Sequence, residues 1–74
     1  MTLDQLLKSQ RAVIVSIDMD HVPLKLIEMG CIVGNTVEVL QIAPLKDPIY
    51  IKINDSFLSI RKDLARYIHV EKSA

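Results

Sequence analysis

Five short segments of this chain are rich in Val, Ile and other apolar residues, and each predicts a β-strand. Branched side chains suit a pleated, half-buried surface, and Gly, Pro, Asn or Asp residues separate several of the segments, as expected for turns. The predicted strands span residues 11–17, 36–42, 48–54, 57–61 and 67–71. Five strands this short predict a mainly β domain that closes, or nearly closes, into a small barrel.

Alternation along each predicted strand assigns its side chains to the two faces of the sheet. The strand over 48–54 has the clearest division, with Ile49, Ile51 and Ile53 on one face and Tyr50, Lys52 and Asn54 on the other. Strict alternation over 36–42 places Ile42 on the face opposite Val39. Over 11–17 it places Ile17 beside Val13 and Val15, and because both faces are apolar this strand is predicted to be well buried.

Helical spacing appears in two places. Leu3, Leu6 and Leu7 predict one short helical turn before the first strand. A second helix is predicted from about Pro23 to Met29, capped by Asp20 or a neighbour and ended by Gly30, because glycine readily adopts the left-handed conformation of a helix C-cap. Its apolar stripe would contain Leu24, Ile27 and Met29, with Leu26 at its side. Residues 62–66 predict a single further turn.

Length and composition restrict the functional classes. Residues 1–74 are predicted to form one domain, flexible at 1–2 and 72–74. Nine basic and nine acidic residues balance, so nucleic acid is not expected as a ligand. The amino terminus has no basic leader followed by an apolar core, and no segment approaches the length of a membrane span. We therefore expect a cytosolic protein that does not insert into the membrane.

Three motifs occur in order along the chain: Lys25-Leu-Ile-Glu-Met-Gly30 followed by a turn at Gly34, Ala43-Pro-Leu-Lys-Asp-Pro48, and Leu58-Ser-Ile-Arg61. Together they resemble the FeoA family, the small cytosolic partners of bacterial ferrous iron transport. The resemblance extends from about Leu3 to Val70. The chain departs from the family pattern in having Lys25 where arginine is more usual, Cys31 where an aliphatic residue is common, and Asn54-Asp-Ser56 in a turn that usually contains glycine.

The resemblance implies an SH3-like β-barrel with one short helix after its first strand. It also implies a protein without enzymatic activity or a required cofactor. Its partner would be a membrane ferrous iron transporter with a cytosolic GTPase domain, which would recruit it to the inner face of the cell membrane. The residues agree with a non-enzymatic role, because no serine or histidine lies in a catalytic motif and no phosphate-binding glycine loop occurs.

Asp18, Asp20 and His21 are the one cluster of metal-ligand residue types close together in sequence. Two carboxylates and an imidazole suit weak binding of Fe²⁺ or another divalent transition metal. Capping of the following helix is the simpler explanation, because Asp is common at such positions. The metal interpretation leaves open a metal-sensing regulatory domain, related to the SH3-like domain of metal-dependent repressors and with Glu28 as a further ligand.

Two regions are candidates for contact with a protein partner. One is the end of the second helix, and the other is the proline-bounded loop at 43–48. The candidate residues are Lys25, Leu26, Met29, Cys31, Leu45, Lys46 and Asp47. The alternative is that their apolar side chains fill the ends of the barrel. A self-associating structural module, paired through an edge strand at 67–71, also remains open. Cys31 follows a helix C-terminus, where the local dipole does not favour a thiolate, so a redox role is not expected.

Overall fold

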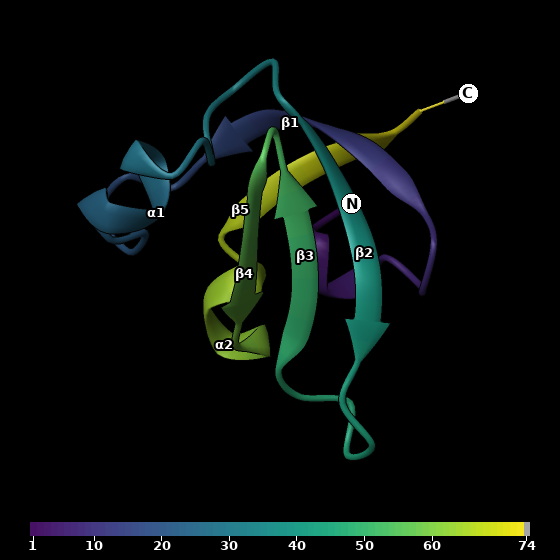
Figure 1. Cartoon of the computed structure of the whole chain (residues 1–74). Helices are drawn as coiled ribbons and strands as arrows, with labels where there is room; N and C mark the ends of the chain where they lie inside the picture. The colour runs from purple at the N-terminus through teal and green to yellow at the C-terminus, as the bar shows by residue number, and fades with distance from the viewer. Residues whose placement is uncertain (74) are drawn as a thin grey trace.

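A computed structural model describes residues 1–73 of the chain and places five antiparallel strands in one curled sheet (Figure 1). The strand order is β4-β3-β2-β1-β5, so β4 and β5 form the two edges. The elements are the 3-10 helix η1 (Leu3–Gln5), β1 (Arg11–Ile17), α1 (Leu24–Glu28), β2 (Thr36–Ile42), β3 (Ile49–Ile53), β4 (Ser56–Ile60), α2 (Lys62–Ala65) and β5 (Ile68–Lys72). The mainly β architecture with few short helices is confirmed.

The core lies on the concave face of the sheet and is almost entirely aliphatic. Ile49, Ile51 and Ile53 of β3 are fully buried, as alternation predicted, and they pack with Leu3 and Leu6 from the amino-terminal turn. The whole set of buried residues is Leu3, Leu6, Ala12, Ile14, Val22, Cys31, Val37, Val39, Ile49, Ile51, Ile53, Ile60, Ala65, Ile68 and Val70. No polar or charged residue among residues 1–73 is buried with them.

Two β-bulges correct the predicted division of faces in β1 and β2. Ile14 pairs with Val70 while Ser16 pairs with His69, so Val15 is an extra residue. Ile17 consequently packs against the core instead of sharing the outer face with Val15, which is 41% exposed. The prediction that β1 is buried on both faces was therefore wrong. Val15 is exposed on the outer face, and the bulge shifts the side chains that follow it by one position, which brings Ile17 to the core side.

The second bulge lies in β2. Val39 pairs with Ile51 and Gln41 with Tyr50, which leaves Leu40 as the extra residue. Ile42 then lies opposite Ile49 and packs against the core on the same side as Val39. Its predicted place on the opposite face was wrong for the same reason as in β1.

The connections follow the turn signals in the sequence, with some corrections. Gly30 and Gly34 have φ angles of +109° and +97°, and Asn54 has a φ of +52° in the two-residue turn between β3 and β4. No side chain caps α1; Asp18 instead caps the turn before it, since its Oδ1 accepts the Asp20 N–H at 3.0 Å. Leu24 is 66% exposed, because α1 contacts the core through Leu26 and Ile27.

Both ends of the described chain form hydrogen bonds with neighbouring strands. The Val70 N–H donates to the Met1 carbonyl at 2.9 Å, and the Ser73 N–H donates to the Arg11 carbonyl at 3.1 Å. Thr2 forms a bridge with His69, and Lys72 belongs to β5. Residue 74 lies outside the described residues. No helix within residues 1–73 is long and apolar enough to cross a membrane.

Candidate functional site

The partner candidates near α1 differ in how much of each side chain reaches the surface. Lys25 is exposed, whereas Leu26 and Met29 are half-buried. Leu26 also packs against the core. Cys31 is fully buried, so its side chain cannot contact a partner, and including it among the candidates was wrong. Its apolar character fits the interior, where free cysteine behaves as a small hydrophobe.

The second candidate region, the 43–48 loop, projects beyond the ends of β2 and β3 (Figure 1). Leu45 is 91% exposed at its tip, and Lys46 beside it is also exposed. Asp47 is engaged within the fold, because its Oδ1 accepts the Lys62 N–H at 3.0 Å and its Oδ2 lies 3.4 Å from Arg61. Figure 1 places this loop and α1 at different ends of the sheet. The structure therefore does not bring the two candidate regions into one patch.

The three metal candidates lie in the turn between β1 and α1. The His21 Nδ1 donates to Asp18 Oδ2 at 2.9 Å, and the His21 ring stacks on Tyr67 with the ring centroids 4.1 Å apart. This hydrogen bond, ahead of the one from the Asp20 N–H, lowers the pKa of Asp18 below 3.8. Within residues 1–73 no group of three or more His, Cys, Asp or Glu side chains is arranged to hold a metal ion. These contacts give Asp18 and His21 a structural role in the turn.

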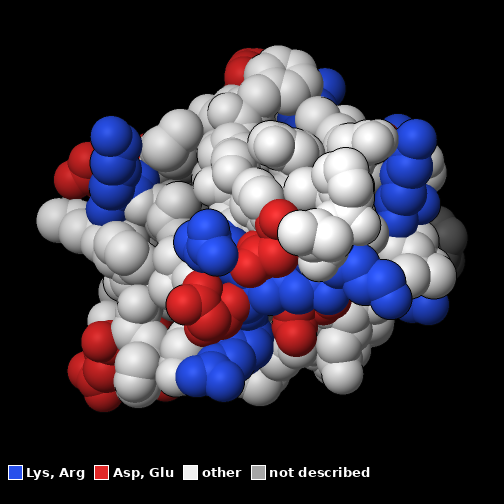
Figure 2. All heavy atoms as spheres, turned by 90° about the horizontal axis from the view of Figure 1, so that it is seen from below, with Lys and Arg blue, Asp and Glu red and all other residues white. Residues whose placement is uncertain are grey.

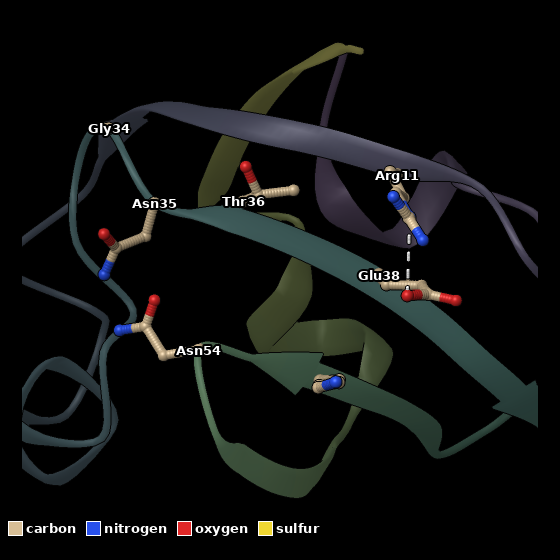
Figure 3. A pocket seen from close by; sticks show the side chains of 7 residues that line it. Arg11, Gly34, Asn35, Thr36, Glu38 and Asn54 are labelled. Atoms are coloured by element: carbon tan, nitrogen blue, oxygen red, sulfur yellow. Dashed lines mark ion pairs between the residues drawn. The ribbon is translucent and has the colours of Figure 1, made fainter.

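A shallow polar depression lies on the outer face of the sheet, close to the end of the β1–β2 connection and to the β3–β4 turn (Figure 3). Three of its polar side chains have partners within the chain. Arg11 Nε pairs with Glu38 Oε1 at 3.5 Å, and Asn35 Nδ2 donates to the Gly30 carbonyl at 2.7 Å. Asn54 forms the tight turn described above. These contacts explain the polar composition of the depression as part of the sheet and its turns.

A second groove runs between the open edge of β4 and the helices α1 and α2. Its lining is mixed, with apolar Leu26, Leu64 and Tyr67 beside charged side chains. The full lining is His21, Leu26, Ser59, Ile60, Arg61, Asp63, Leu64, Arg66 and Tyr67. Of the residues singled out in the sequence, Leu26, His21 and the last three residues of the Leu58-Ser-Ile-Arg61 motif take part. The remainder come from α2 and the segment between α2 and β5. The sequence did not indicate that these segments would meet, because only the fold brings them together.

Charges on this part of the molecule are intermingled. Figure 2, viewed from below, shows basic and acidic side chains next to one another, with no broad area of one sign on this face. In the groove, Arg66 donates to the Tyr67 hydroxyl at 3.1 Å and lies over its ring. No carboxylate among residues 1–73 forms an ion pair with Arg66. A ligand of this groove would be recognised through individual ion pairs and apolar contacts.

The Cys31 thiol is expected to be nearly unreactive in the folded protein. Burial raises its pKa from 9.0 to about 11, which makes the thiolate about 100-fold scarcer at pH 8 than at an ordinary cysteine. Ellman's reagent should therefore react slowly with the native chain and rapidly in urea. Because the unfolded chain loses this proton first, stability should fall as the pH rises from about 9 towards 11. Rapid reaction of the folded chain at pH 8 would contradict this assignment.

Comparison with known proteins gives consistent results. Residues 1–72 match the family model of the FeoA domain. The chain is 42% identical over 72 residues to an Fe(2+) transport protein A/Fe(2+) transporter FeoB fusion protein of Porphyromonas gingivalis. The match covers 96% of this chain but only 8% of that much longer protein.

Solved structures show the same fold. The solution structure of the FeoA protein from Chlorobium tepidum superposes with a TM-score of 0.91 and 33% identity, covering 100% of this chain and 71% of that one. A zinc complex of Stenotrophomonas maltophilia FeoA, described as a prokaryotic SH3 domain protein, superposes with a TM-score of 0.83 at 24% identity, covering 96% and 89%. The fold is therefore SH3-like, and the chain belongs to the FeoA domain family.

Proposed function

We propose that this chain is a cytosolic, non-enzymatic accessory protein of bacterial ferrous iron uptake that contacts the cytosolic GTPase region of a membrane ferrous iron transporter. The observation that carries the proposal is the Porphyromonas gingivalis fusion, in which a sequence 42% identical to this chain belongs to one polypeptide with the transporter FeoB. Covalent linkage keeps two modules at a high effective concentration. Fusion therefore suits modules that act on one another. The same modules on separate chains must associate through a binding surface.

The geometry supports action by contact. In the depression on the outer face, Asn35 is engaged in a structural hydrogen bond and Arg11 pairs with Glu38, and Cys31 is buried with a raised pKa. The surface does offer apolar side chains that a partner could cover, with Leu24 and Leu45 being 66% and 91% exposed. Lys25, Leu26, Met29, Leu45, Lys46 and Asp47 remain the proposed contact residues at the two ends of the sheet.

A binding assay with the cytosolic region of the same organism's ferrous iron transporter tests this function. The immobilised domain should retain that region, and either Met29→Asp or Leu45→Asp should reduce retention about 10-fold or more by placing a charge in an apolar contact. Leu7→Asp is the matched control, because Leu7 is 64% exposed and precedes β1, outside both candidate regions. Circular dichroism would verify that each variant folds. Absence of retention, with or without guanine nucleotide, would overturn direct contact.

A further inference from the structure

The two edges of the sheet are treated differently by the rest of the chain. Along the outer edge of β5, the Val70 N–H donates to the Met1 carbonyl at 2.9 Å, and Thr2 forms a bridge with His69. The chain's own first two residues thus cover part of that edge. Along β4, pairing is confined to β3 on one side, and no other segment of residues 1–73 pairs with it. β4 is therefore the more open of the two edges.

The turn geometry identifies which main-chain groups of β4 lack partners. Ile53 pairs with Ser56 across a two-residue turn, so these two residues exchange hydrogen bonds. The pattern then alternates, and Leu58 and Ile60 also bond to β3. Phe57 and Ser59 consequently direct their N–H and carbonyl groups away from the sheet, and no hydrogen bond within residues 1–73 engages these groups outside the β3–β4 pairing. Their spacing of about 7 Å is that of an extended backbone.

The surroundings of this edge would accommodate a single extended segment. The groove described above begins at Ser59 and Ile60 and has Leu26 of α1, Leu64 of α2 and Tyr67 along its other side. A chain lying along β4 would direct alternate side chains towards these apolar groups, as in other cases of strand addition to a sheet edge. In Figure 1, α2 lies at the lower end of β4 and α1 lies on the side of β4 away from β3, so a strand added to this edge would run between β4 and α1.

The charges of the groove indicate the chemistry of the segment. Arg61 and Arg66 line it together with one carboxylate, that of Asp63. Arg61 is engaged only by the 3.4 Å contact with Asp47, and Arg66 forms no ion pair in the described part of the chain. A carboxylate on the incoming segment could pair with either guanidinium, and a bidentate arrangement would fix its register.

We propose that the β4 edge binds an extended segment of the transporter's cytosolic region as an added strand. Phe57 and Ser59 supply the main-chain hydrogen bonds, Leu26, Leu64 and Tyr67 receive an apolar side chain, and Arg61 or Arg66 pairs with an acidic one. This inference rests on the proposed function. It adds the mode of binding and the chemistry of the recognised segment, and it assigns recognition to a groove that includes residues of β4 and α2.

Amide hydrogen exchange followed by NMR tests the mode of binding directly. In the free domain the Phe57 and Ser59 amides should exchange quickly. Adding the transporter's cytosolic region should slow them about 10-fold or more, because hydrogen-bonded amides exchange only through opening. The Lys8 amide, which lies in an exposed turn before β1 and outside both candidate regions, is the internal control. Binding that leaves the Phe57 and Ser59 amides unchanged would overturn strand addition while leaving the proposed function intact.

A matched pair of substitutions gives an independent test. Ser59→Pro removes the outward N–H without removing a β3–β4 hydrogen bond, and proline is tolerated on edge strands. Ser59→Ala keeps that N–H. We expect Ser59→Pro to bind about 10-fold more weakly than Ser59→Ala, because the two variants both lack the hydroxyl and differ in the outward N–H.

Other outcomes also decide the proposal. If Ser59→Pro fails to fold, the exchange measurement on the unaltered chain provides the answer. Equal binding by both variants would overturn strand addition alone, whereas no binding by any form would remove the proposed function as well. Protection of the Phe57 and Ser59 amides that grows with the concentration of the isolated domain would assign the edge to a second copy and overturn the proposal.

Discussion

Replacing Ile51 with alanine is expected to lower the free energy of unfolding by about 2–5 kcal/mol, the usual cost of removing a large aliphatic side chain from a packed core. Ile51 is fully buried at the middle of β3, between Val39 of β2 and Leu58 of β4. A chain of this length has a total stability of about 4–11 kcal/mol. The substitution should therefore consume a large part of the stability, and a shift of the urea unfolding midpoint would measure the loss.

Two controls isolate the effect of the core position. Ile51→Val removes one methylene group and should cost only about 0.5–1.5 kcal/mol. Val15→Ala alters a bulge residue that is 41% exposed, so its effect should be smaller than that of Ile51→Ala. An Ile51→Ala variant that unfolds at the same urea concentration as the parent chain would show that β3 is not the centre of the core.

Gly30→Ala should lower the free energy of unfolding by about 1–3 kcal/mol from backbone strain alone. The φ angle of Gly30 is +109°, which an L-residue rarely adopts. A Cβ there would also lie 3.0 Å from the Asn54 side-chain nitrogen and 3.2 Å from Ile53 Cγ2. Ile53 is fully buried and has little room to move. Thermal unfolding followed by circular dichroism would give the loss.

Gly34→Ala separates strain from collision. Gly34 has a similar φ of +97°, but a Cβ there meets no atom within 4 Å. Its variant should thus report backbone strain alone, and Gly30→Ala should be worse by roughly 1 kcal/mol, the order of the cost of moderate overpacking. Equal losses for the two glycines would mean that α1 and the β3–β4 turn are not held in contact.

The strand pattern of this chain was predictable because most of its strands lie at a boundary between core and solvent. The bounds of β1 and β2 were predicted correctly, and the alternation of β3 was confirmed from Ile49 to Ile53. Alternation failed in β1 and β2 because each contains an extra residue, and a bulge has no hydrophobic signature of its own. Leu24 was misplaced for a related reason, since a helix as short as α1 can bury only part of an apolar stripe.

The candidate site was less predictable than the fold. The contact candidates were chosen from a helix end and a proline-bounded loop that could offer apolar atoms with flanking charges, and the structure places these two regions at different ends of the sheet. The groove beside β4 depends on distant segments that meet only after folding, among them Leu26, Ser59 and Arg66. The open edge at β4 could not be inferred from the sequence either. It depends on tertiary structure, which places Met1 and Thr2 against the other edge, β5.

The bulges at Val15 and Leu40 also determine where this sheet can change in length. Removing one residue from a regular strand turns every later apolar side chain towards solvent. If Val15 were removed, Ile14 and Ile17 would still face the core and Ser16 would still face outward, as they do now. The same holds for Leu40, between Val39 and the pair Gln41 and Ile42. Related chains that differ by a single residue within these strands would thus keep the same interior if the gap falls at a bulge.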